Sequence, residues 1–300
     1  MDGLWKKAGG AWSSLVTKYP ELDRLQKQAV NLLPALGLAQ GAVYTLSQGR
    51  RYKVVQQLGD GAYSTVYLVQ AVQDGTGEGE LLALKQSGSA WDAVQRAAAV
   101  GRAVPIRVAL SIFIQLCAAL EALHAAGLAH RDLKPHNVLL EPRQGGGLRA
   151  VLVDFGSVAP CPEPVPDRGV AARVQEEAEA HSSAPYRAPE LWEAEPGRDL
   201  TAAADVWSAG ALLYCLVWGA SPFERATSNG QGGSLRLAVL NGRVPFAPDD
   251  RAAARDGALR RLVERCLAPD PAARPSAAAA KLEAQGVLEE VAQAHLVPGA

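Results

Sequence analysis

The sequence contains few sulfur-bearing and aromatic residues and almost no net charge. Of its 300 residues, one is Met, four are Cys and 6% are aromatic. The cysteines are scattered, without a C-x-x-C pair or a nearby histidine cluster, which argues against a zinc site and favours a reducing compartment. Lys and Arg number 30 against 31 Asp and Glu, a formal net charge of −1. This balance argues against a nucleic-acid binder driven by phosphate neutralisation.

The sequence also lacks the patterns of membrane targeting. No apolar run follows Lys6 and Lys7, so the first residues do not read as a signal peptide. The longest apolar stretches, 110–123 and 211–219, are shorter than the ~20 residues that a membrane-spanning helix needs. Position 2 is Asp rather than Gly, so we expect no N-myristoyl group. These absences favour a cytoplasmic location.

A hydrophobic content of 48% is enough to build a substantial core. Strand patterns come first, at residues 52–58, 65–72 and 81–85. Helical patterns follow, at residues 106–126, 170–180, 205–218, 259–267 and 277–288. Two short strand patterns, 138–140 and 151–153, lie among the helices, and four prolines make residues 157–169 irregular. Strands followed by helices predict an α+β fold with two lobes.

The most informative segment is residues 130–137, which read H-R-D-L-K-P-H-N. It places a carboxylate (Asp132), an ammonium group (Lys134) and an amide (Asn137) within six positions. Such a set can align a hydroxyl, a phosphoryl group and a metal ion. The pattern H-R-D-L-x-x-x-N is the catalytic-loop signature of protein kinases, and D-F-G at 154–156 and A-P-E at 188–190 follow in the same order. The chain therefore resembles a serine/threonine protein kinase.

The resemblance implies a role for each polar residue of this segment. Asp132 is the expected base for the substrate hydroxyl, and Lys134 offsets charge on the transferred phosphoryl group. Asn137 and Asp154 are the expected Mg²⁺ ligands, since Mg²⁺ prefers oxygen donors. His130 is expected to be a packing residue. A lysine two residues after the aspartate marks serine/threonine specificity in the family. ATP and Mg²⁺ are thus the expected cofactors, and a protein substrate is the expected partner.

Residues 59–66 read G-D-G-A-Y-S-T-V between two strand patterns and resemble the glycine-rich loop that covers the phosphates of ATP. Glycine allows backbone N–H groups to approach phosphate oxygens, although a glycine hairpin between strands is also common. A lysine ends the A-L-K strand, where the family has a phosphate-binding lysine and where a solvated charge is the alternative. The expected nucleotide-binding residues are Gly59, Gly61, Ser64, Val66, Lys85, Asn137 and Asp154.

The activation segment between D-F-G and A-P-E leaves two interpretations open. Arg131 precedes the catalytic aspartate, and in the family such an arginine often meets a phosphorylated activation segment. Ser182, Ser183 and Tyr186 are the candidate acceptors. A phosphate on one of them would give Arg131 a charge-assisted partner. Alternatively, these hydroxyls only cap or line the loop.

Three further residues have structural roles in the family. Glu190 and Arg274 resemble the buried ion pair that ties the activation segment to the last helices. Asp205 resembles the aspartate that holds the backbone of the catalytic loop. All three are present, so we expect a complete helical C-lobe.

Residues 129–135, 154–157 and 183–191 are similar to the Numb-associated kinase family, and most of all to its small Golgi-associated, lipid-anchored branch. That branch also has a serine at the third glycine of the loop and a helix in a long activation segment. The likeness covers about residues 41–285. The acylated N-terminus of the branch is absent. We therefore expect a cytoplasmic protein or one at the surface of Golgi or other endomembranes.

The predicted domains are an extension, a kinase domain and a tail. The extension, residues 1–48, is partly helical over 22–33, and its Trp and Lys residues suggest weak contact with a membrane surface. The kinase domain divides into a truncated N-lobe (49–89) and a C-lobe (90–288), and residues 289–300 form a tail. The sequence does not indicate an oligomeric state.

The N-lobe is predicted to lack a segment. Residues 88–95 resemble the helix after the hinge, so the αC helix, two strands and the hinge have no room between Lys85 and that helix. Those elements would take about 40 residues. No glutamate lies between Gln86 and Glu121 to pair with Lys85, and reading 91–100 as αC does not supply one. We expect an open edge on the third strand and a weak or inactive kinase, with a kinase-like scaffold as the alternative function.

Overall fold

The computed structural model describes residues 40–41, 43–45, 51–61, 64–72, 81–143, 147–228, 233–246 and 257–294. Within them, one antiparallel sheet has the strand order β1-β2-β3-β4-β6-β7, and a second, two-strand ribbon pairs β5 with β8. The strands are β1 (Val43–Thr45), β2 (Arg51–Gly61), β3 (Ser64–Val72), β4 (Leu81–Ser89), β5 (Leu128–Ala129), β6 (Val138–Pro142), β7 (Leu148–Leu152) and β8 (Ala159–Pro160).

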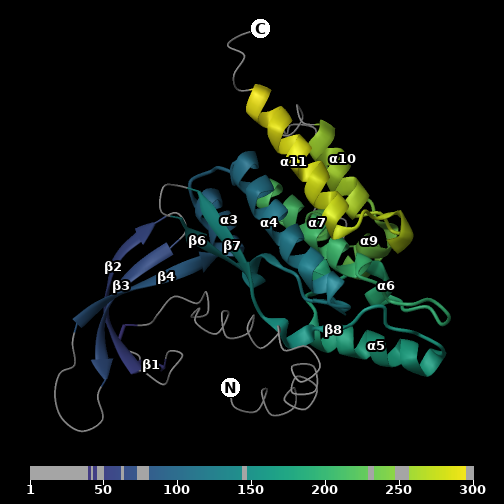
Figure 1. Ribbon diagram of the computed structural model, residues 1–300, viewed down its shortest axis with the longest axis horizontal. Helices are drawn as coiled ribbons and strands as arrows, with labels where there is room; N and C mark the ends of the chain where they lie inside the picture. Colours follow the sequence, from purple (N-terminus) through teal and green to yellow (C-terminus); the bar gives the residue numbers. More distant parts are fainter. Residues whose placement is uncertain are drawn as a thin grey trace.

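The helices gather at the other end of the molecule from β1–β3 (Figure 1). They are α3 (Ala90–Ala99), α4 (Ile106–Ala125), α5 (Arg168–His181), α6 (Pro189–Trp192), α7 (Ala203–Trp218), α8 (Pro222–Ser228), α9 (Leu235–Asn241), α10 (Gly257–Cys266) and α11 (Ala277–Ala294). Short 3₁₀ turns are η1 (Pro135–Asn137), η2 (Phe155–Ser157), η3 (Ala184–Tyr186) and η4 (Pro271–Ala273). The fold is α+β with a strand-rich lobe and a helical lobe, as the sequence predicts.

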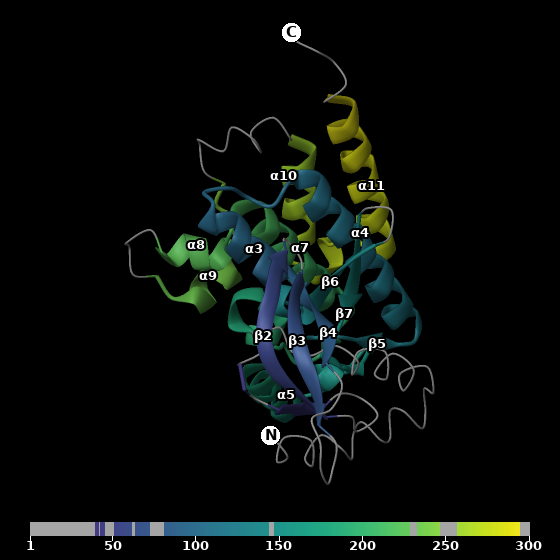
Figure 2. The same cartoon turned by 90° about the vertical axis from the view of Figure 1, so that its left-hand side faces the viewer.

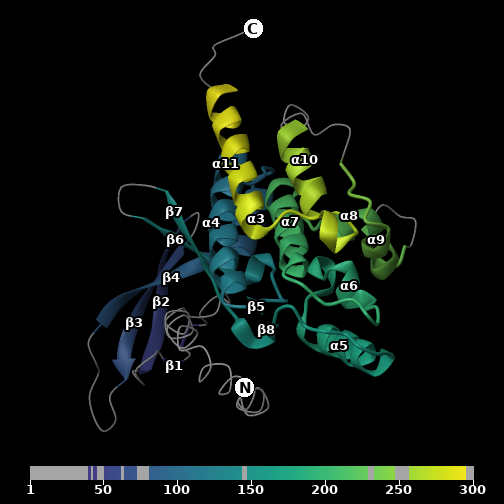
Figure 3. The ribbon, with the colours of Figure 1, turned by 45° about the vertical axis from the view of Figure 1, so that its right-hand side comes forward.

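The hydrophobic core lies in the helical lobe around α7, in which every residue after the first is buried. Figure 3 shows α7 running beside α4 and α10, with α11 packed along α4. The strand-rich lobe has a far smaller cluster, formed by Val54, Tyr67 and Val69 with Tyr52 packed against it. A sheet of three strands is marginal by itself unless it packs against other elements, so we expect it to depend on its attachment to the helical lobe.

Helix α4 spans 20 residues and is long and apolar enough to cross a bilayer by length and composition. This corrects the expectation that the apolar stretch at 110–123 is too short. Eight of its residues are buried, and it packs against α7, α11 and β7. Its apolar composition is therefore explained by its place in the core. Gly127 follows it with φ of +72°, as expected of the residue after a helix end.

Most predicted elements are present, with shifted ends. Helices α5 and α11 are longer than predicted, because Asp167 caps α5 two residues earlier and α11 continues to Ala294. Strand β1 was not predicted and lies inside the segment expected to be a partly helical extension. The helix expected at 22–33 lies outside the described residues. Of the tail expected at 289–300, residues 289–294 belong to α11, and residues 295–300 lie outside the described residues.

Strand β4 continues directly into helix α3, and this junction joins the two lobes (Figure 2). Ser89 closes a capping box, since its hydroxyl accepts from Asp92 N–H while the Asp92 carboxylate accepts from Ser89 N–H. Gly88 and Ser89 pair with Leu140 and Leu139 of β6. The expectation of a wholly open edge on the third strand is therefore wrong at its last two residues. The β-hairpin of the C-lobe covers them because no further strand intervenes.

Candidate active site

A carboxylate of the core helix α7 accepts two hydrogen bonds from the backbone of the catalytic-loop segment. Asp205 Oδ2 accepts from His130 N–H at 2.7 Å, and Oδ1 accepts from Arg131 N–H at 2.8 Å. Arg131 has φ of +66°, a left-handed conformation that is uncommon for a non-glycine residue. The two hydrogen bonds offset the cost of that conformation and fix the backbone that leads into Asp132. This is the position expected for Asp205.

Asp205 is fully buried and also lies 2.9 Å from His124 Nε2. Burial alone raises the pKa of its carboxyl group. The hydrogen bond and charge of His124, together with the hydrogen bond from the backbone N–H of His130, outweigh burial and leave the pKa of Asp205 below its usual range. The carboxylate thus stays ionised and holds the loop throughout the neutral pH range.

Asp132 lies at the centre of the cluster that the sequence predicts. Its Oδ2 is 2.8 Å from Lys134 Nζ and accepts from Asn137 Nδ2 at 3.2 Å. The same amide nitrogen donates to the Asp132 carbonyl at 2.8 Å, which fixes the turn η1. Oδ1 accepts from the backbone N–H of Ser183 at 2.9 Å. The carboxylate is therefore oriented by the catalytic loop on one side and the activation segment on the other.

Asp154 comes to the same region through the β6–β7 hairpin. Val153 N–H donates to the carbonyl of Asn137 at 2.9 Å, which places the D-F-G segment beside the catalytic loop. The ring of Phe155, the residue after Asp154, packs 5.3 Å from that of His130. The D-F-G segment and the catalytic loop are therefore neighbours in the fold. Asp154 has φ of +67°, a conformation that Asp adopts more readily than most residues.

The side-chain oxygens of Asn137 and Asp154 are ligand atoms of the kind that Mg²⁺ binds. The amide nitrogen of Asn137 is used in two hydrogen bonds, which leaves its oxygen directed elsewhere. Asp154 is exposed, and its carboxylate accepts no hydrogen bond from any residue that the structure describes. No group of three His, Cys, Asp or Glu side chains gathers in the described part of the chain. An amide and a single carboxylate suit an ion that keeps several waters and phosphate oxygens as ligands.

His130 is completely buried, as expected of a packing residue. Its Nε2 lies 3.3 Å from the carbonyl of Val153, and Nδ1 accepts from Asp132 N–H. The ring also packs at 5.3 Å from that of Phe155. Burial lowers the pKa of His130, despite the opposing charges of Asp205 and Asp132. The neutral ring ties the catalytic loop to the D-F-G segment.

This burial predicts an acid-sensitive fold. Below the usual histidine pKa of ~6.5, the imidazole of residue 130 is protonated in the unfolded chain but stays neutral in the folded chain. The free energy of unfolding therefore falls by up to about 1.4 kcal/mol for each unit by which the pH is lowered. His130→Phe should lower stability at pH 7 but flatten the dependence between pH 7 and 5. Urea unfolding at several pH values measures both. Exposed His181→Gln serves as the control, and an unchanged slope in His130→Phe would contradict the assignment.

The expected nucleotide-binding residues of the strand-rich lobe lie near one end of the β2–β3 hairpin, at two neighbouring levels of the sheet. Gly59 pairs with Val66, and Val66 pairs with Lys85 on the next strand. Gly61 pairs with Ser64 at the end of the same hairpin. The backbone register therefore places Gly59, Val66 and Lys85 at one level of the sheet, and Gly61 and Ser64 two residues further along the hairpin. Strand β4 then reaches β6, whose first residue follows Asn137 directly.

Arg131 has a partner that the sequence did not predict. Its Nη1 lies 2.5 Å from Oε2 of Glu163, as an ion pair that is not aligned as a hydrogen bond. Glu163 is itself fixed by two backbone hydrogen bonds of 2.8 Å with Leu200. Ser182 Oγ meanwhile donates to the carbonyl of Ala178 at the end of α5. At Arg131, the structure favours the interpretation in which the activation-segment hydroxyls cap and line the loop.

The sequence did not predict two further contacts of the catalytic loop. Trp91 of α3 stacks on His136 of the catalytic loop, with ring centroids 5.1 Å apart. Ser183 is linked to Asp132 through its backbone N–H, a group that every residue except proline carries. No motif marks either contact, because each joins segments that are distant in sequence.

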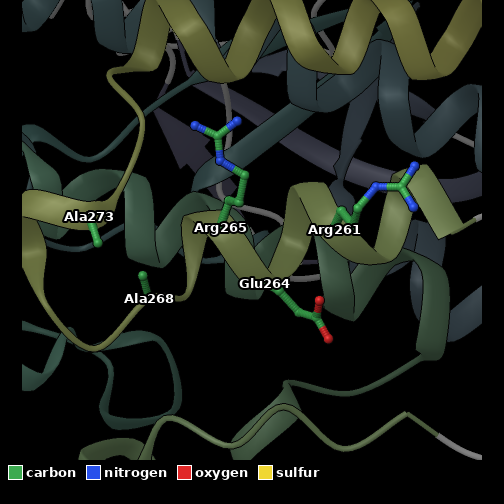
Figure 4. Close-up of a pocket in the computed structure, with 5 residues that line it drawn as sticks. All are labelled: Arg261, Glu264, Arg265, Ala268 and Ala273. Atoms are coloured by element: carbon green, nitrogen blue, oxygen red, sulfur yellow. The ribbon is translucent and has the colours of Figure 1, made fainter.

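One hollow of about 370 Å³ lies elsewhere, between α10 and the turn η4, and is lined by Arg261, Glu264, Arg265, Ala268 and Ala273. Figure 4 shows Glu264 pointing away from the two arginines, so the charged groups do not converge. Arg265 is also paired with Glu283 of α11. None of these residues belongs to the cluster around Asp132, and we assign the hollow no part in its chemistry.

Residues 81–284 match the family described as the protein kinase domain. Among curated proteins, the chain is similar to serine/threonine-protein kinase ppk13 of Schizosaccharomyces pombe, at 40% identity over 49% of this chain and 41% of that protein. It is similar to serine/threonine-protein kinase 16 of Rattus norvegicus, at 33% identity over 65% of this chain and 61% of that protein. Serine/threonine-protein kinase PkaA of Streptomyces coelicolor is 38% identical over 69% and 34%, respectively. The chain thus spans less than two thirds of each relative.

Proposed function

The chain belongs to the protein kinase family, because residues 81–284 match the model of the protein kinase domain, and we propose that it transfers the γ-phosphoryl group of ATP to serine or threonine hydroxyls of protein substrates. The observation that carries the proposal is the geometry around Asp132. Its carboxylate is oriented by Lys134, Asn137 and the Ser183 N–H within 3.2 Å.

In this proposal, Asp132 orients the substrate hydroxyl and accepts its proton late in the reaction. Lys134, already beside that carboxylate, lies where it can offset negative charge on the phosphoryl group. Asn137 and Asp154 hold Mg²⁺, which when bound neutralises charge on the phosphates. The β2–β3 hairpin with Gly59, Gly61, Ser64 and Val66, together with Lys85 on the next strand, lies over the phosphates. Catalysis of this kind is mostly positioning and electrostatic stabilisation, so the orientation of the cluster matters more than proton affinity.

A second function, a catalytically impaired kinase-like scaffold, is favoured by the β4–α3 junction. Strand β4 passes from Lys85 to Ser89 and enters α3 at Ala90, with no hinge between them. No glutamate lies between Gln86 and Glu121 to pair with Lys85, and a misplacement of ~1 Å at such a site can cost ~100-fold in rate. The large core of the helical lobe would keep that lobe folded, and its surface would then bind other proteins.

Thermal melting with nucleotide separates the two functions. If the site binds ATP with Mg²⁺, a concentration 100 times Kd should add about 2.7 kcal/mol of stability, which raises Tm by roughly 2–4 °C per kcal/mol. Asp154→Asn is the matched control, because asparagine tolerates the left-handed backbone of this residue. The Mg²⁺-dependent part of the shift should disappear in that variant. A cooperative melt that ATP and Mg²⁺ leave unchanged would reject the enzyme and support the scaffold.

The finer assignments are also proposals. The motifs at 129–135, 154–157 and 183–191 support placement in the Numb-associated group, in its Golgi-associated branch. The similarity to serine/threonine-protein kinase 16 is consistent with a serine/threonine specificity. We propose a cytoplasmic location or one at an endomembrane surface. The segment expected to contact membranes, residues 1–39 of the extension, lies outside the described residues.

A further inference from the structure

A ligand that bridges the two parts of the proposed phosphate site lies beside the junction between β4 and α3. Ser89 ends β4 four residues after Lys85, and it pairs with Leu139, two residues after Asn137. Both β4 and α3 contact η1, the turn that contains Asn137. Figure 1 shows β4 ending beside β6 and α3. The junction therefore lies between the strand that carries Lys85 and the loop that carries Asn137.

The polar side chains of this junction are engaged with each other. Ser89 is buried, and its N–H and its hydroxyl donate to one carboxylate oxygen of Asp92 at 2.6 and 2.8 Å. The Asp92 N–H donates back to the hydroxyl at 3.2 Å. The backbone of Gly88 and Ser89 is paired with that of Leu140 and Leu139. These groups are therefore used inside the fold rather than held ready for a ligand.

The remaining surfaces of the junction are apolar or aromatic. Strand β6 contributes Val138, Leu139 and Leu140, all buried and all without a polar side-chain atom. Trp91 and His136 are stacked on each other, with ring centroids 5.1 Å apart. Stacking on an aromatic ring accepts any nucleobase, because every base has a π-face. None of these contacts distinguishes one base from another.

Selection between nucleobases needs polar groups aimed at the base edge. Adenine presents an amino donor where guanine presents a carbonyl acceptor, so a protein tells them apart by placing a matching acceptor or donor there. A site that hydrogen-bonds the differing group rejects the wrong ligand by roughly 10,000- to 100,000-fold. The junction between β4 and α3 offers engaged polar side chains and apolar surfaces, so this source of discrimination is weak in the part of the chain that the structure describes.

We propose that this site recognises its phosphoryl donor by the phosphates and not by the base. Its ligands are then nucleoside triphosphates in general, together with inorganic tripolyphosphate, each as a Mg²⁺ complex. Lys134, Asn137 and Asp154 are the groups that act on the phosphates and the metal, and the loop at residues 59–66 adds backbone N–H groups. The inference rests on the proposed function and deepens it by naming the class of donor.

The transfer is balanced with each of these donors. The substrate hydroxyl oxygen forms a bond to the terminal phosphorus, and the bond from that phosphorus to its bridging oxygen breaks. The hydroxyl proton passes to the carboxylate of Asp132. The leaving group is the nucleoside diphosphate, or pyrophosphate when tripolyphosphate is the donor. The base takes no part in either bond change, so it affects only binding.

The test is to titrate the full chain with the Mg²⁺ complexes of ATP, GTP, CTP and tripolyphosphate, by calorimetry and by thermal melting. The four apparent Kd values should agree within about tenfold, roughly the effect of one neutral hydrogen bond. Asp154→Asn should weaken all four ligands together, because they share one site. Asp199→Asn, at an exposed position, should leave the four affinities unchanged.

The outcomes separate this inference from the function on which it rests. A preference for ATP over GTP and CTP of more than about tenfold would overturn base-independent recognition and would leave the proposed function standing. Binding that Asp154→Asn does not weaken would place the ligands elsewhere and would also overturn the inference. Binding of none of the four ligands would overturn both the inference and the kinase function.

Discussion

Replacing Asp132 by asparagine is expected to lower phosphoryl transfer by roughly 100- to 10,000-fold, the usual contribution of a positioned base. Asparagine removes the proton acceptor and puts an N–H₂ group where two donors, Lys134 Nζ and Asn137 Nδ2, now converge. One side-chain oxygen can accept either from these donors or from Ser183 N–H. The measurement is transfer of labelled phosphate from ATP to a generic serine-containing protein substrate.

The same contacts predict a modest loss of stability in Asp132→Asn, of about 1–3 kcal/mol, because a buried donor loses its acceptor. Thermal melting should therefore accompany the activity assay. Asp199→Asn, at an exposed position, is the control and should retain both activity and Tm. Retention of more than about a tenth of the rate in Asp132→Asn would remove Asp132 from the role of base. No transfer by the unmodified chain would instead favour the scaffold.

Breaking the ion pair between Glu190 and Arg274 should have the largest effect on stability. Arg274 Nη1 and Nη2 donate to the two carboxylate oxygens at 2.7 and 2.8 Å, and the arginine side chain is fully buried. The guanidinium also donates to the carbonyls of Ala203, Ala268 and Pro269. Glu190→Gln leaves this charge buried without its partner, so we expect a loss of about 3–5 kcal/mol.

Urea unfolding measures that loss, and an exposed pair supplies the control. Arg236 and Glu193 are 2.8 Å apart with about half of each side chain exposed. Arg236→Gln should cost less than ~1 kcal/mol, because solvent screens an exposed pair. Similar losses in the two variants would show that the Glu190–Arg274 pair does not tie the activation segment to the helices around α7.

The catalytic-loop cluster could be predicted from sequence because its members are close along the chain. Asp132, Lys134 and Asn137 occupy one loop and one 3₁₀ turn, so local geometry brings them together. Periodic apolar positions predicted α4, and a stretch that is apolar on nearly all sides predicted α7. The direct passage from β4 into α3 agrees with the prediction that little room follows Lys85 before the next helix, which was based on average element lengths. Helix ends and β1 were less predictable, because capping and edge pairing depend on contacts outside the local pattern.

The pairing between β4 and β6 shows what the sequence left undecided. A strand pattern at 81–85 indicates a strand but not its neighbours, so the edge was expected to be open. In the folded chain, Ser89 caps α3, and this connection brings Gly88 beside the C-lobe hairpin. Backbone hydrogen bonds form wherever two edges meet, whatever the side chains.

By itself, the sequence determined the chemistry that this protein carries: a carboxylate, an amine and an amide at fixed short spacing, in a chain whose apolar pattern builds a helical core. Only the tertiary structure decided the partners of its charges, with Arg131 paired to Glu163 and Arg187 turned toward Ser182. The reason is physical. A guanidinium group binds the acceptor oxygens that the fold places within reach, and which distant segments lie within reach depends on the whole fold.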